Sequence, residues 1–465
     1  MAARLYVTDS GRYVHSHPFT PSHLQPLILH PRYFHAGAIA IITVGLPARG
    51  KTHVSRSLCR YLRWLGVPTK VFSVGNYRRQ RLGTMPNDFF SPANEDTKEQ
   101  RLLIAEACLK DMIEWLEKGG QVGIYDASNT TDERRAWIQR KLKEHDIQTL
   151  FIESICNKQE IIDSNIRSVK ISSPDYVGWD PEAAVRDFKN RIENHLPYYK
   201  TIRDPELPFV KLMNVGEQLI VNNVKGYLQS RIVYYLMHLH IQPRIIYFAR
   251  IPESLNESSY KADADLSPVG HKQAEALKTF IVNYRQQQLD MGIEEKLRPL
   301  TVWGSTRKHA SQAVRHFAED DILVRALPLL TERNPGECDG LTPQQIKLND
   351  GCHFVQAKFP EEFTKSQQDP YNHRYPRAES YHDLAVRLEA CIMELEREKN
   401  DVLIIGHDSV LRCLYAYLFD RPDDEIPSIH IPRNYLIQIK PSAYGCRETR
   451  LEIQMEEESD EDDQL

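Results

Sequence analysis

AIAIITV at residues 38–44 runs directly into GLPARGKT at residues 45–52, and this junction decides the fold of the N-terminal half of the chain. The first stretch is uncharged and apolar, with five β-branched residues, which is typical of a buried strand in a parallel sheet. The second matches GxxxxGK[ST], a glycine-rich loop whose backbone N–H groups bind phosphate at the start of a helix. Apolar residues at helical spacing follow between Val54 and Leu65. The sequence therefore predicts a strand, a phosphate-binding loop and a helix, in that order.

Side chains of the loop and of a second strand supply the charge that a nucleotide site needs. Lys51 would neutralise charge on the β- and γ-phosphates, and the hydroxyl of Thr52 would bind Mg²⁺. Asp126 lies in the apolar stretch 121–127, at the carboxyl edge where an open α/β sheet places its ligands. We expect Asp126 to bind Mg²⁺ or to orient an acceptor hydroxyl. The alternative is that it caps the helix that follows.

Arginines placed after strands or on predicted helices suggest a phosphorylated acceptor. Arg78 and Arg79, Arg134 and Arg191 would face one sheet edge if the sheet is wound as expected. A guanidinium binds phosphate through two parallel hydrogen bonds, so such a group suits an anionic second substrate. Each arginine taken alone is better explained as a solvated surface charge.

Short apolar stretches alternate with helical segments, which predicts an α/β fold in two domains. Strands are expected at 38–44, 70–74, 121–127, 149–155, 245–249, 300–305 and 401–408. Helices are expected at 98–117, 132–144, 267–288 and 379–398, and from Val215 to His240, where Pro243 would end the helix. The expected units are an N-terminal arm at 1–36, a P-loop kinase domain with a mainly parallel doubly wound sheet at 37–243, a second α/β domain at 244–445 and an acidic tail at 446–465.

Composition excludes several classes of protein. The net charge is −5, and the seven acids between Glu456 and Asp463 account for more than all of it, so the rest of the chain is nearly neutral and gives no reason to expect nucleic acid. Eight cysteines are scattered without a CxxC pair, which is typical of reduced thiols in the cytoplasm. No apolar stretch approaches the roughly 20 residues that span a bilayer. We therefore expect a cytoplasmic protein without a membrane partner.

Five dispersed motifs stand out in the first half: VGLPARGKT (44–52), WLGVPTKVFSVGNYRR (64–79), YDASNTTDERR (125–135), SNIRSVKISSPDY (164–176) and QSRIVYYLMHLHIQPR (229–244). Together they closely resemble the kinase half of the 6-phosphofructo-2-kinase/fructose-2,6-bisphosphatase family. The resemblance continues to about residue 440. It implies transfer of the ATP γ-phosphoryl group to the 2-hydroxyl of fructose 6-phosphate, with Mg²⁺ as cofactor, and a homodimer.

The resemblance also implies roles for individual residues. Asp126, Lys170 and Lys51 become the catalytic residues, with Lys170 bridging nucleotide and sugar phosphate, and Thr52 and Asp126 become the metal ligands. The implied ATP-binding residues are Gly45, Leu46, Pro47, Ala48, Arg49, Gly50, Lys51, Thr52 and Asn165. The implied fructose 6-phosphate residues are Arg78, Arg79, Arg101, Ser128, Arg134, Lys170, Arg191 and His195. Ser128 replaces a threonine of the family and keeps its hydroxyl, whereas His195 replaces a tyrosine that contacts the sugar. Cys156 falls on a family site near the nucleotide, but it is equally well explained as a core thiol.

The second half resembles the histidine phosphatase fold, whose signature is a strand followed by Arg-His-Gly-Glu. Here that tetrapeptide is Arg250-Ile251-Pro252-Glu253. The histidine is the nucleophile that becomes phosphorylated, and isoleucine has no lone pair to replace it. Proline also replaces a glycine whose flexibility lets the backbone approach phosphate. The sequence thus predicts that the covalent route to hydrolysis is closed.

Only some of the other residues of the family's phosphatase site are present in this sequence. Arg250, Glu332, His407 and Arg412 match the resemblance, but they are better explained as contacts left over in the fold. The resemblance pairs cationic, aromatic or amide groups of the family with His309, Pro343, Ser366, Pro370 and Asp408. Losing cationic donors removes the charge-assisted hydrogen bonds that hold a bisphosphate, and Asp408 would repel one.

The preferred hypothesis is a kinase that makes fructose 2,6-bisphosphate, with the phosphatase activity lost or very weak. Three alternatives remain: a bifunctional enzyme with residual phosphatase activity, a P-loop polynucleotide kinase fused to a phosphatase relic, and a regulatory pseudoenzyme. The polynucleotide kinase would need a basic, aromatic groove, and the near-neutral chain argues against it.

Overall fold

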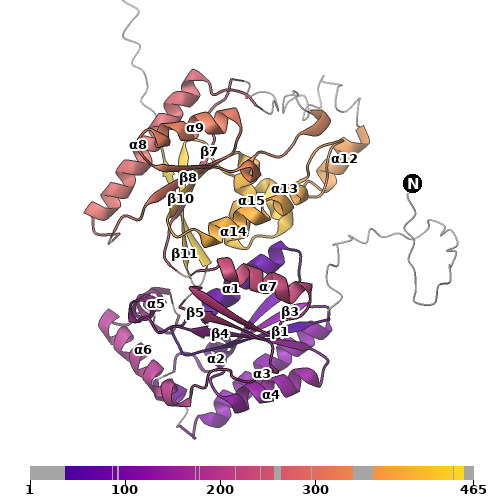
Figure 1. Ribbon diagram of the computed structural model, residues 1–465, viewed down its shortest axis with the longest axis vertical. Coiled ribbons are helices and arrows are strands. Elements are labelled where there is room, and N and C mark those ends of the chain that lie inside the picture. Colours follow the sequence, from indigo (N-terminus) through magenta and orange to yellow (C-terminus); the bar gives the residue numbers. More distant parts are fainter. Residues whose placement is uncertain are drawn as a thin grey trace, which may run out of the picture. The chain divides into compact units, whose positions relative to one another are not determined.

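The computed structural model describes residues 37–454 except 86, 92–93, 173, 177, 215, 241, 256–262, 295, 339–359 and 443–444. The expected N-terminal arm and the end of the acidic tail lie outside the described residues. Within this range the structure contains two six-stranded sheets, one in the N-terminal half (37–243) and one in the C-terminal half (244–454). The expected α/β fold with two sheets is confirmed (Figure 1). None of the described helices combines the length and apolar character that crossing a membrane requires.

The N-terminal sheet has the strand order β2-β3-β1-β4-β5-β6. Its strands are β1 (Ile39–Val44), β2 (Thr69–Ser73), β3 (Val122–Asp126), β4 (Gln148–Ile155), β5 (Phe209–Met213) and β6 (Gln218–Asn222). All neighbours pair in parallel except β5 and β6. Every residue of β1 and β3 is buried, as their apolar composition predicts for central strands.

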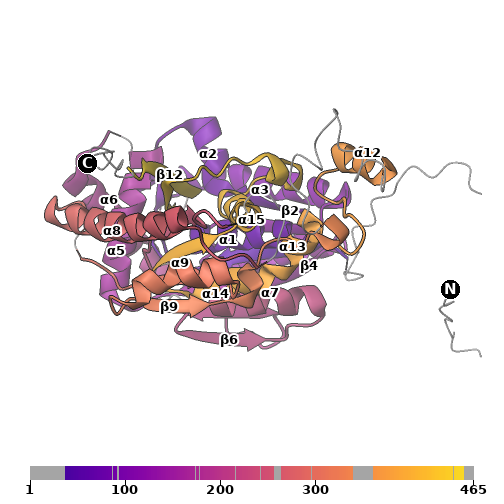
Figure 2. The same cartoon turned by 90° about the horizontal axis from the view of Figure 1, so that it is seen from above.

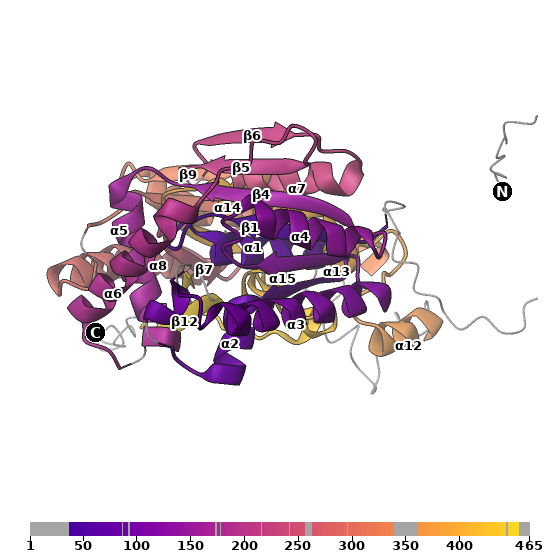
Figure 3. The ribbon, with the colours of Figure 1, turned by 90° about the horizontal axis from the view of Figure 1, so that it is seen from below.

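Helices cover both faces of this sheet. On one face, α3 (Lys98–Glu117) and α4 (Asp132–Lys143) pack on the strands through an apolar cluster that includes Met112, Ile138 and Ile42 (Figure 3). The opposite face packs against α1 (Lys51–Trp64), which contacts α7 (Tyr227–His238). The other α-helices among the described residues of this half are α2 (Val74–Leu82), α5 (Gln159–Ser172) and α6 (Pro181–His195). The result is the doubly wound arrangement expected from the alternation of strands and helices.

The expected long helix from Val215 to His240 is wrong. The first part of this stretch forms β6, an edge strand that pairs antiparallel with β5, and only the second part is helical. Two positive φ angles separate the parts, 49° at Asn223 and 85° at Gly226, and a right-handed helix cannot continue through such residues. The helix therefore begins at Tyr227.

The C-terminal sheet has the strand order β12-β11-β7-β10-β8-β9. Its strands are β7 (Ile246–Arg250), β8 (Leu300–Gly304), β9 (Leu323–Ala326), β10 (Asp401–Gly406), β11 (Tyr435–Ser442) and β12 (Gly445–Glu452). The four strands β7 to β10 are parallel, and β11 and β12 add an antiparallel hairpin at the β7 edge. The expected boundary of the tail at 446 is wrong, because 445–452 pairs with β11 as a strand.

Two helix layers enclose this sheet as well. On one face, α8 (Pro268–Asp290) and α9 (Lys308–Ala318) pack side by side on Tyr247, Val302 and Leu403 (Figure 2). The other α-helices among the described residues of this half are α12 (Pro360–Gln368), α13 (Tyr381–Arg387), α14 (Glu389–Arg397) and α15 (Asp408–Phe419). The single helix expected at 379–398 is thus two helices that meet at Leu388.

Candidate functional site

The phosphate-binding loop lies between the end of β1 and the start of α1, as the sequence predicts. Two of its glycines are required by the backbone. Gly45 has φ of 138°, and a Cβ there would lie 2.5 Å from the carbonyl oxygen of Ser154. Gly50 has φ of 77° and immediately precedes the helix. The loop therefore turns tightly and directs backbone N–H groups at the start of α1 toward the space where phosphate would bind.

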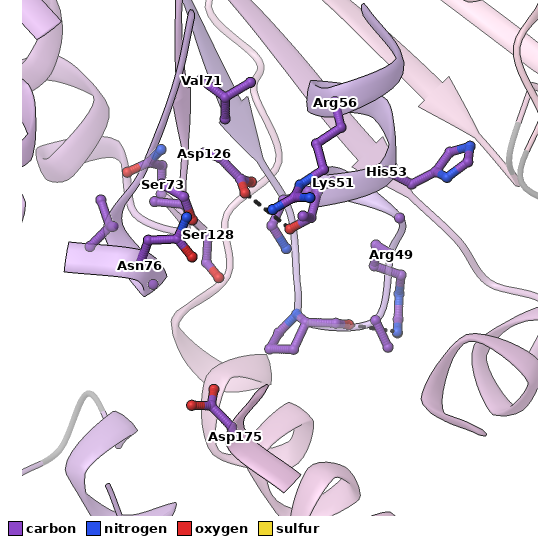
Figure 4. A pocket seen from close by; sticks show the side chains of 18 of the residues that line it. Arg49, Lys51, His53, Arg56, Val71, Ser73, Asn76, Asp126, Ser128 and Asp175 are labelled. Atoms are coloured by element: carbon purple, nitrogen blue, oxygen red, sulfur yellow. Dashed lines mark hydrogen bonds between the residues drawn. The ribbon is translucent and has the colours of Figure 1, made fainter. Parts of the chain in front are cut away.

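Lys51 and Asp126 lie together at this edge of the sheet (Figure 4), and Thr52 lines the same cavity. Asp126 ends β3, the strand next to β1, and only 5% of it is exposed. The Thr52 hydroxyl donates to Asp126 Oδ2 at 3.0 Å, and Lys51 Nζ donates to the carbonyl oxygen of Leu46 at 2.7 Å. Mg²⁺ prefers oxygen ligands and takes only one or two from the protein when phosphates supply others, so this hydroxyl and carboxylate fit the expected metal.

Burial shifts the charge equilibria of this pair. Burial lowers the pKa of Lys51 to about 8, while its attraction to Asp126 raises it. Burial also raises the pKa of Asp126, against opposing effects of Lys51 and of the Thr52 hydrogen bond. Each group thus stabilises the charged form of the other, and a phosphate at the loop would add a second anion beside Lys51.

We expect this lysine to set the alkaline limit of nucleotide use. Below pH 8 the unliganded protein carries a cationic Lys51, and as pH rises through about 8 the proton is lost and phosphate is bound less tightly. kcat/KM for Mg-ATP should therefore fall above about pH 8, because this ratio reports groups of the free enzyme. Lys51→Arg keeps its charge throughout, so its lower activity should lack this decline. A decline that persists in Lys51→Arg would assign it to another group.

A single cavity of about 1390 Å³ contains most of the expected kinase residues. The volume of this cavity exceeds the roughly 300–1,000 Å³ of a typical small-molecule site. The cavity is therefore large enough to hold two substrates at once. The expected residues that line it are Pro47, Ala48, Arg49, Gly50, Lys51, Thr52, Arg78, Arg79, Arg101, Asp126, Ser128, Arg134, Asn165, Arg191 and His195. Lys170 lies on α5, and its side chain is outside the described part of the chain.

Two arginines at this cavity converge on one carboxylate. Arg78 donates to both oxygens of Asp175 at 2.7 Å, and Arg79 donates to one of them at 3.2 Å. The guanidinium of Arg191 lies 3.4 Å from the centre of the Phe90 ring, and that of Arg78 lies 5.0 Å from the same centre. Sequence reasoning missed Asp175 and Phe90. Asp175 lies within the quoted motif 164–176, whereas nothing in the sequence pairs Phe90 with two distant arginines.

The other expected substrate residues are held by polar contacts. Arg134 donates to the Tyr125 hydroxyl at 2.9 Å, and Arg101 donates to the carbonyl oxygens of Phe89 and Asn94 at 3.0 and 3.1 Å. His195 Nδ1 lies 2.8 Å from the carbonyl oxygen of Arg191, and burial lowers the pKa of His195 to about 4, so it is neutral near pH 7. A neutral imidazole can donate to or accept from a sugar hydroxyl.

Both sides of the phosphate-binding loop are braced by expected residues. The backbone N–H of Gly45 donates to the carbonyl oxygen of Ser128 at 3.0 Å, and the amide of Asn165 donates to the carbonyl oxygen of Ala48 at 3.0 Å. The cavity also includes residues that sequence reasoning missed: His240 and Gln242 from the end of the N-terminal half, and Arg244, Asp420, Ser442 and Cys446 from the C-terminal half. Cys156 is buried in an apolar cluster with Ile162 and Ile166, as its alternative explanation predicts.

The second site forms where β7 and β10 end side by side. Arg250 pairs with Gly406 in the parallel register, and the backbone N–H of Ile251 donates to the carbonyl oxygen of Gly406 at 3.0 Å. Ile251 thus follows the end of β7 next to His407. Its side chain packs on the apolar cluster between the sheet and helices α8 and α9. An alkyl group thus lies at the position that the family resemblance assigns to the nucleophile.

An acid with few partners lies close by. The Glu332 carboxylate is 4.0 Å from His309 Nε2 and 3.5 Å from Arg307 Nε, and neither of its oxygens has a hydrogen-bond partner among the described residues. Arg307, at the start of α9, is a cation that sequence reasoning missed. Ser366 on α12 donates to the carbonyl oxygen of Phe363 at 2.7 Å, and Pro343 lies outside the described residues.

The remaining polar residues of this site pair with one another. Asp408 Oδ2 lies 2.9 Å from an Arg412 guanidinium nitrogen, and Asp408 Oδ1 lies 3.0 Å from His407 Nδ1. Arg412 also donates to the Tyr381 hydroxyl at 3.0 Å and to the carbonyl oxygen of Pro427 at 2.8 Å. Arg250 donates to the carbonyl oxygen of Ile431 at 3.3 Å. The structure therefore places His407 and Arg412 around Asp408, and Arg250 and Ile251 at the adjacent end of β7.

Comparison with known proteins agrees with both halves. Residues 30–243 match the 6-phosphofructo-2-kinase family, and residues 253–454 match branch 1 of the histidine phosphatase superfamily. The chain is 42% identical over 423 residues to rat (Rattus norvegicus) 6-phosphofructo-2-kinase/fructose-2,6-bisphosphatase 1, which covers 90% of this chain and 84% of that protein. It is 41% identical over 413 residues to the chicken (Gallus gallus) protein named 6-phosphofructo-2-kinase/fructose-2,6-bisphosphatase, which covers 87% and 83%.

Among solved structures, the alpha-ribazole phosphatase from Shigella flexneri is 20% identical with a TM-score of 0.36, over 46% of this chain and all of that one. The similarity to the rat and chicken proteins is far stronger and runs through both halves. On that ground the chain belongs to the 6-phosphofructo-2-kinase/fructose-2,6-bisphosphatase family.

Proposed function

We propose that the N-terminal half transfers the γ-phosphoryl group of ATP to the 2-hydroxyl of fructose 6-phosphate. The observation that carries this proposal is the convergence of Lys51, Thr52 and Asp126 in a cavity that also contains the arginines expected to bind a sugar phosphate. The family relatives are named for this activity. Phosphoryl transfer depends on positioning and charge neutralisation more than on a strong base, and this cavity offers both.

The residues divide the task by position. Backbone N–H groups of the loop and Lys51 would hold the β- and γ-phosphates. Thr52 and Asp126 would hold Mg²⁺, which when bound neutralises charge on the phosphate oxygens. Asp126 would also orient the sugar hydroxyl and accept its proton late in the transfer. Arg78, Arg79, Arg101, Arg134 and Arg191 would hold the sugar phosphate, with Lys170 between the two substrates.

The Asp175 carboxylate accepts hydrogen bonds from two of these arginines, Arg78 and Arg79. Fructose 6-phosphate would therefore have to bind these arginines together with Asp175 or displace its carboxylate from them. His195 would contact the sugar as a neutral group.

We further propose that the C-terminal half hydrolyses fructose 2,6-bisphosphate very slowly or not at all. Ile251 cannot be phosphorylated, and the cations that would hold the substrate are replaced at His309, Ser366 and Pro370. The proposed kinase domain spans 37–243 and the proposed phosphatase-like domain spans 244–452. We also propose that the protein forms a homodimer and is located in the cytoplasm.

One pair of assays tests both activities. The purified chain is given labelled Mg-ATP and fructose 6-phosphate, and the expected product is a labelled, acid-labile bisphosphate. It is then given fructose 2,6-bisphosphate alone, and we expect no release of phosphate and no phosphorylated protein. Absence of product in the first assay would remove the kinase proposal. Sustained hydrolysis through a phosphoprotein in the second would remove the proposed loss.

Ile251→His should not restore hydrolysis. The histidine would supply the missing nucleophile, but Ser366 and Pro370 would still lack cationic donors and Asp408 would still present a negative charge. Phosphate release from fructose 2,6-bisphosphate should stay within about twofold of the wild-type background, and circular dichroism checks that the variant is folded. Turnover through a phosphohistidine in this variant would show that one substitution alone had silenced the site.

A further inference from the structure

A carboxylate lies among the groups of the C-terminal site that would otherwise attract an anion. Asp408 is the first residue of α15, a helix of 12 residues, and its side chain is 20% exposed. One oxygen lies 2.9 Å from the Arg412 guanidinium, one turn along the same helix, and the other lies 3.0 Å from His407 Nδ1. A helix N-terminus, an arginine and a histidine all favour negative charge at this point.

The environment holds Asp408 in its charged form. Burial alone would raise the pKa of its carboxyl, but His407, Arg412 and Arg250 together hold that pKa well below its usual range. These three residues are also the ones that the family resemblance assigns to the anion pocket. The carboxylate therefore satisfies the groups that a phosphate would need.

We propose that Asp408 is the internal anion of the C-terminal pocket, and that its carboxylate takes the place and the partners of a tetrahedral oxyanion such as inorganic phosphate. The pocket is thus occupied by the chain itself. This inference rests on the proposed loss of hydrolysis but concerns binding, not chemistry. Ile251 closes the covalent route, whereas Asp408 keeps the ligand out.

Neutralising this carboxylate should uncover the pocket. Asp408→Asn keeps the shape of the side chain, removes the negative charge that pairs with His407 and Arg412, and removes the repulsion of an incoming anion. Inorganic phosphate is titrated calorimetrically into the full-length protein, with Mg²⁺, a non-hydrolysable ATP analogue and fructose 6-phosphate filling the kinase cavity. We expect phosphate to bind Asp408→Asn at least about tenfold more tightly than the wild type.

Two further variants make the result specific. Glu425→Gln removes one negative charge from the same half, from an exposed pair with Arg421, and should bind phosphate as the wild type does. The double variant Asp408→Asn with Arg412→Gln should lose the gain, because the freed guanidinium is then absent. If Asp408→Asn is not folded by circular dichroism, Asp408→Gln, with a longer neutral side chain, replaces it.

The outcomes separate this inference from the proposed function. Equal phosphate affinity of the wild type and of the folded Asp408 variant would overturn the inference, and so would a gain that survives Arg412→Gln. Neither result depends on whether the wild type makes or hydrolyses fructose 2,6-bisphosphate, because those activities are measured in separate assays. A tenfold gain that Arg412→Gln abolishes would support it.

Discussion

Asp126→Asn should lower kcat for fructose 2,6-bisphosphate formation by about 10²–10⁴-fold, the range associated with a positioned acid or base. The substitution keeps the size of the side chain and one oxygen near the Thr52 hydroxyl. It removes the charge that would hold Mg²⁺ and accept the proton of the sugar hydroxyl. Transfer of label from ATP, measured at saturating concentrations of both substrates, gives kcat directly.

Binding measurements and a control separate catalysis from folding. Fructose 6-phosphate affinity should change little, because the arginines that would bind it are untouched. Asp111→Asn is a matched control. This exposed aspartate on α3 accepts a hydrogen bond from the Tyr77 hydroxyl and does not line the cavity. It should retain full activity. A decrease of less than about fivefold in Asp126→Asn would contradict the role proposed for this carboxylate.

Glu396→Gln should lower the free energy of unfolding by about 3–5 kcal/mol, the typical result of removing one partner of a buried ion pair. Glu396 lies on α14 and is 4% exposed. It accepts hydrogen bonds from Arg60 at 2.7 Å, from the Tyr417 hydroxyl at 2.6 Å and from Arg244 at 3.3 Å. The glutamine would leave two buried guanidinium groups without a counter-charge.

This prediction has a matched control and a pH signature. Glu394→Gln, on the same helix, removes a charge from an exposed pair with Arg397 and should change stability by less than about 1 kcal/mol. Burial alone would raise the pKa of Glu396, but Arg60 and Arg244 lower it to about 2. The carboxylate therefore stabilises the fold above its unfolded pKa near 4.5, and this stability is lost as pH falls toward 2.

Urea unfolding of the full chain between about pH 5 and pH 2 tests whether stability falls with pH as predicted. The wild type should lose stability more steeply than Glu396→Gln as pH falls from about 5. If both proteins lost stability equally steeply, a carboxylate other than Glu396 would account for most of the pH dependence. Because Arg60 lies on α1, the helix that begins with Lys51 and Thr52, the same variant also reports how far the phosphate-binding helix depends on the C-terminal half.

The sequence by itself predicted the central strands and the loop. β1, β3, β7 and β10 are buried along nearly all their length, so their composition alone is diagnostic. The phosphate-binding loop and Asp126 were also predictable, because the loop needs glycines at fixed spacing and because the parallel sheet carries both elements to one edge. The identity of the acceptor rested on the family resemblance.

Edge strands and distant partners were decided only by the tertiary structure. β6 and β12 are largely exposed, so they lack the apolar signal of a central strand, and their pairing with β5 and β11 determines their conformation. The contacts of Asp175 with Arg78, of Glu396 with Arg60 and of Phe90 with Arg191 join residues far apart in the chain. Local sequence fixes backbone preference and burial, whereas the position of each charge relative to its partner depends on how distant segments pack together.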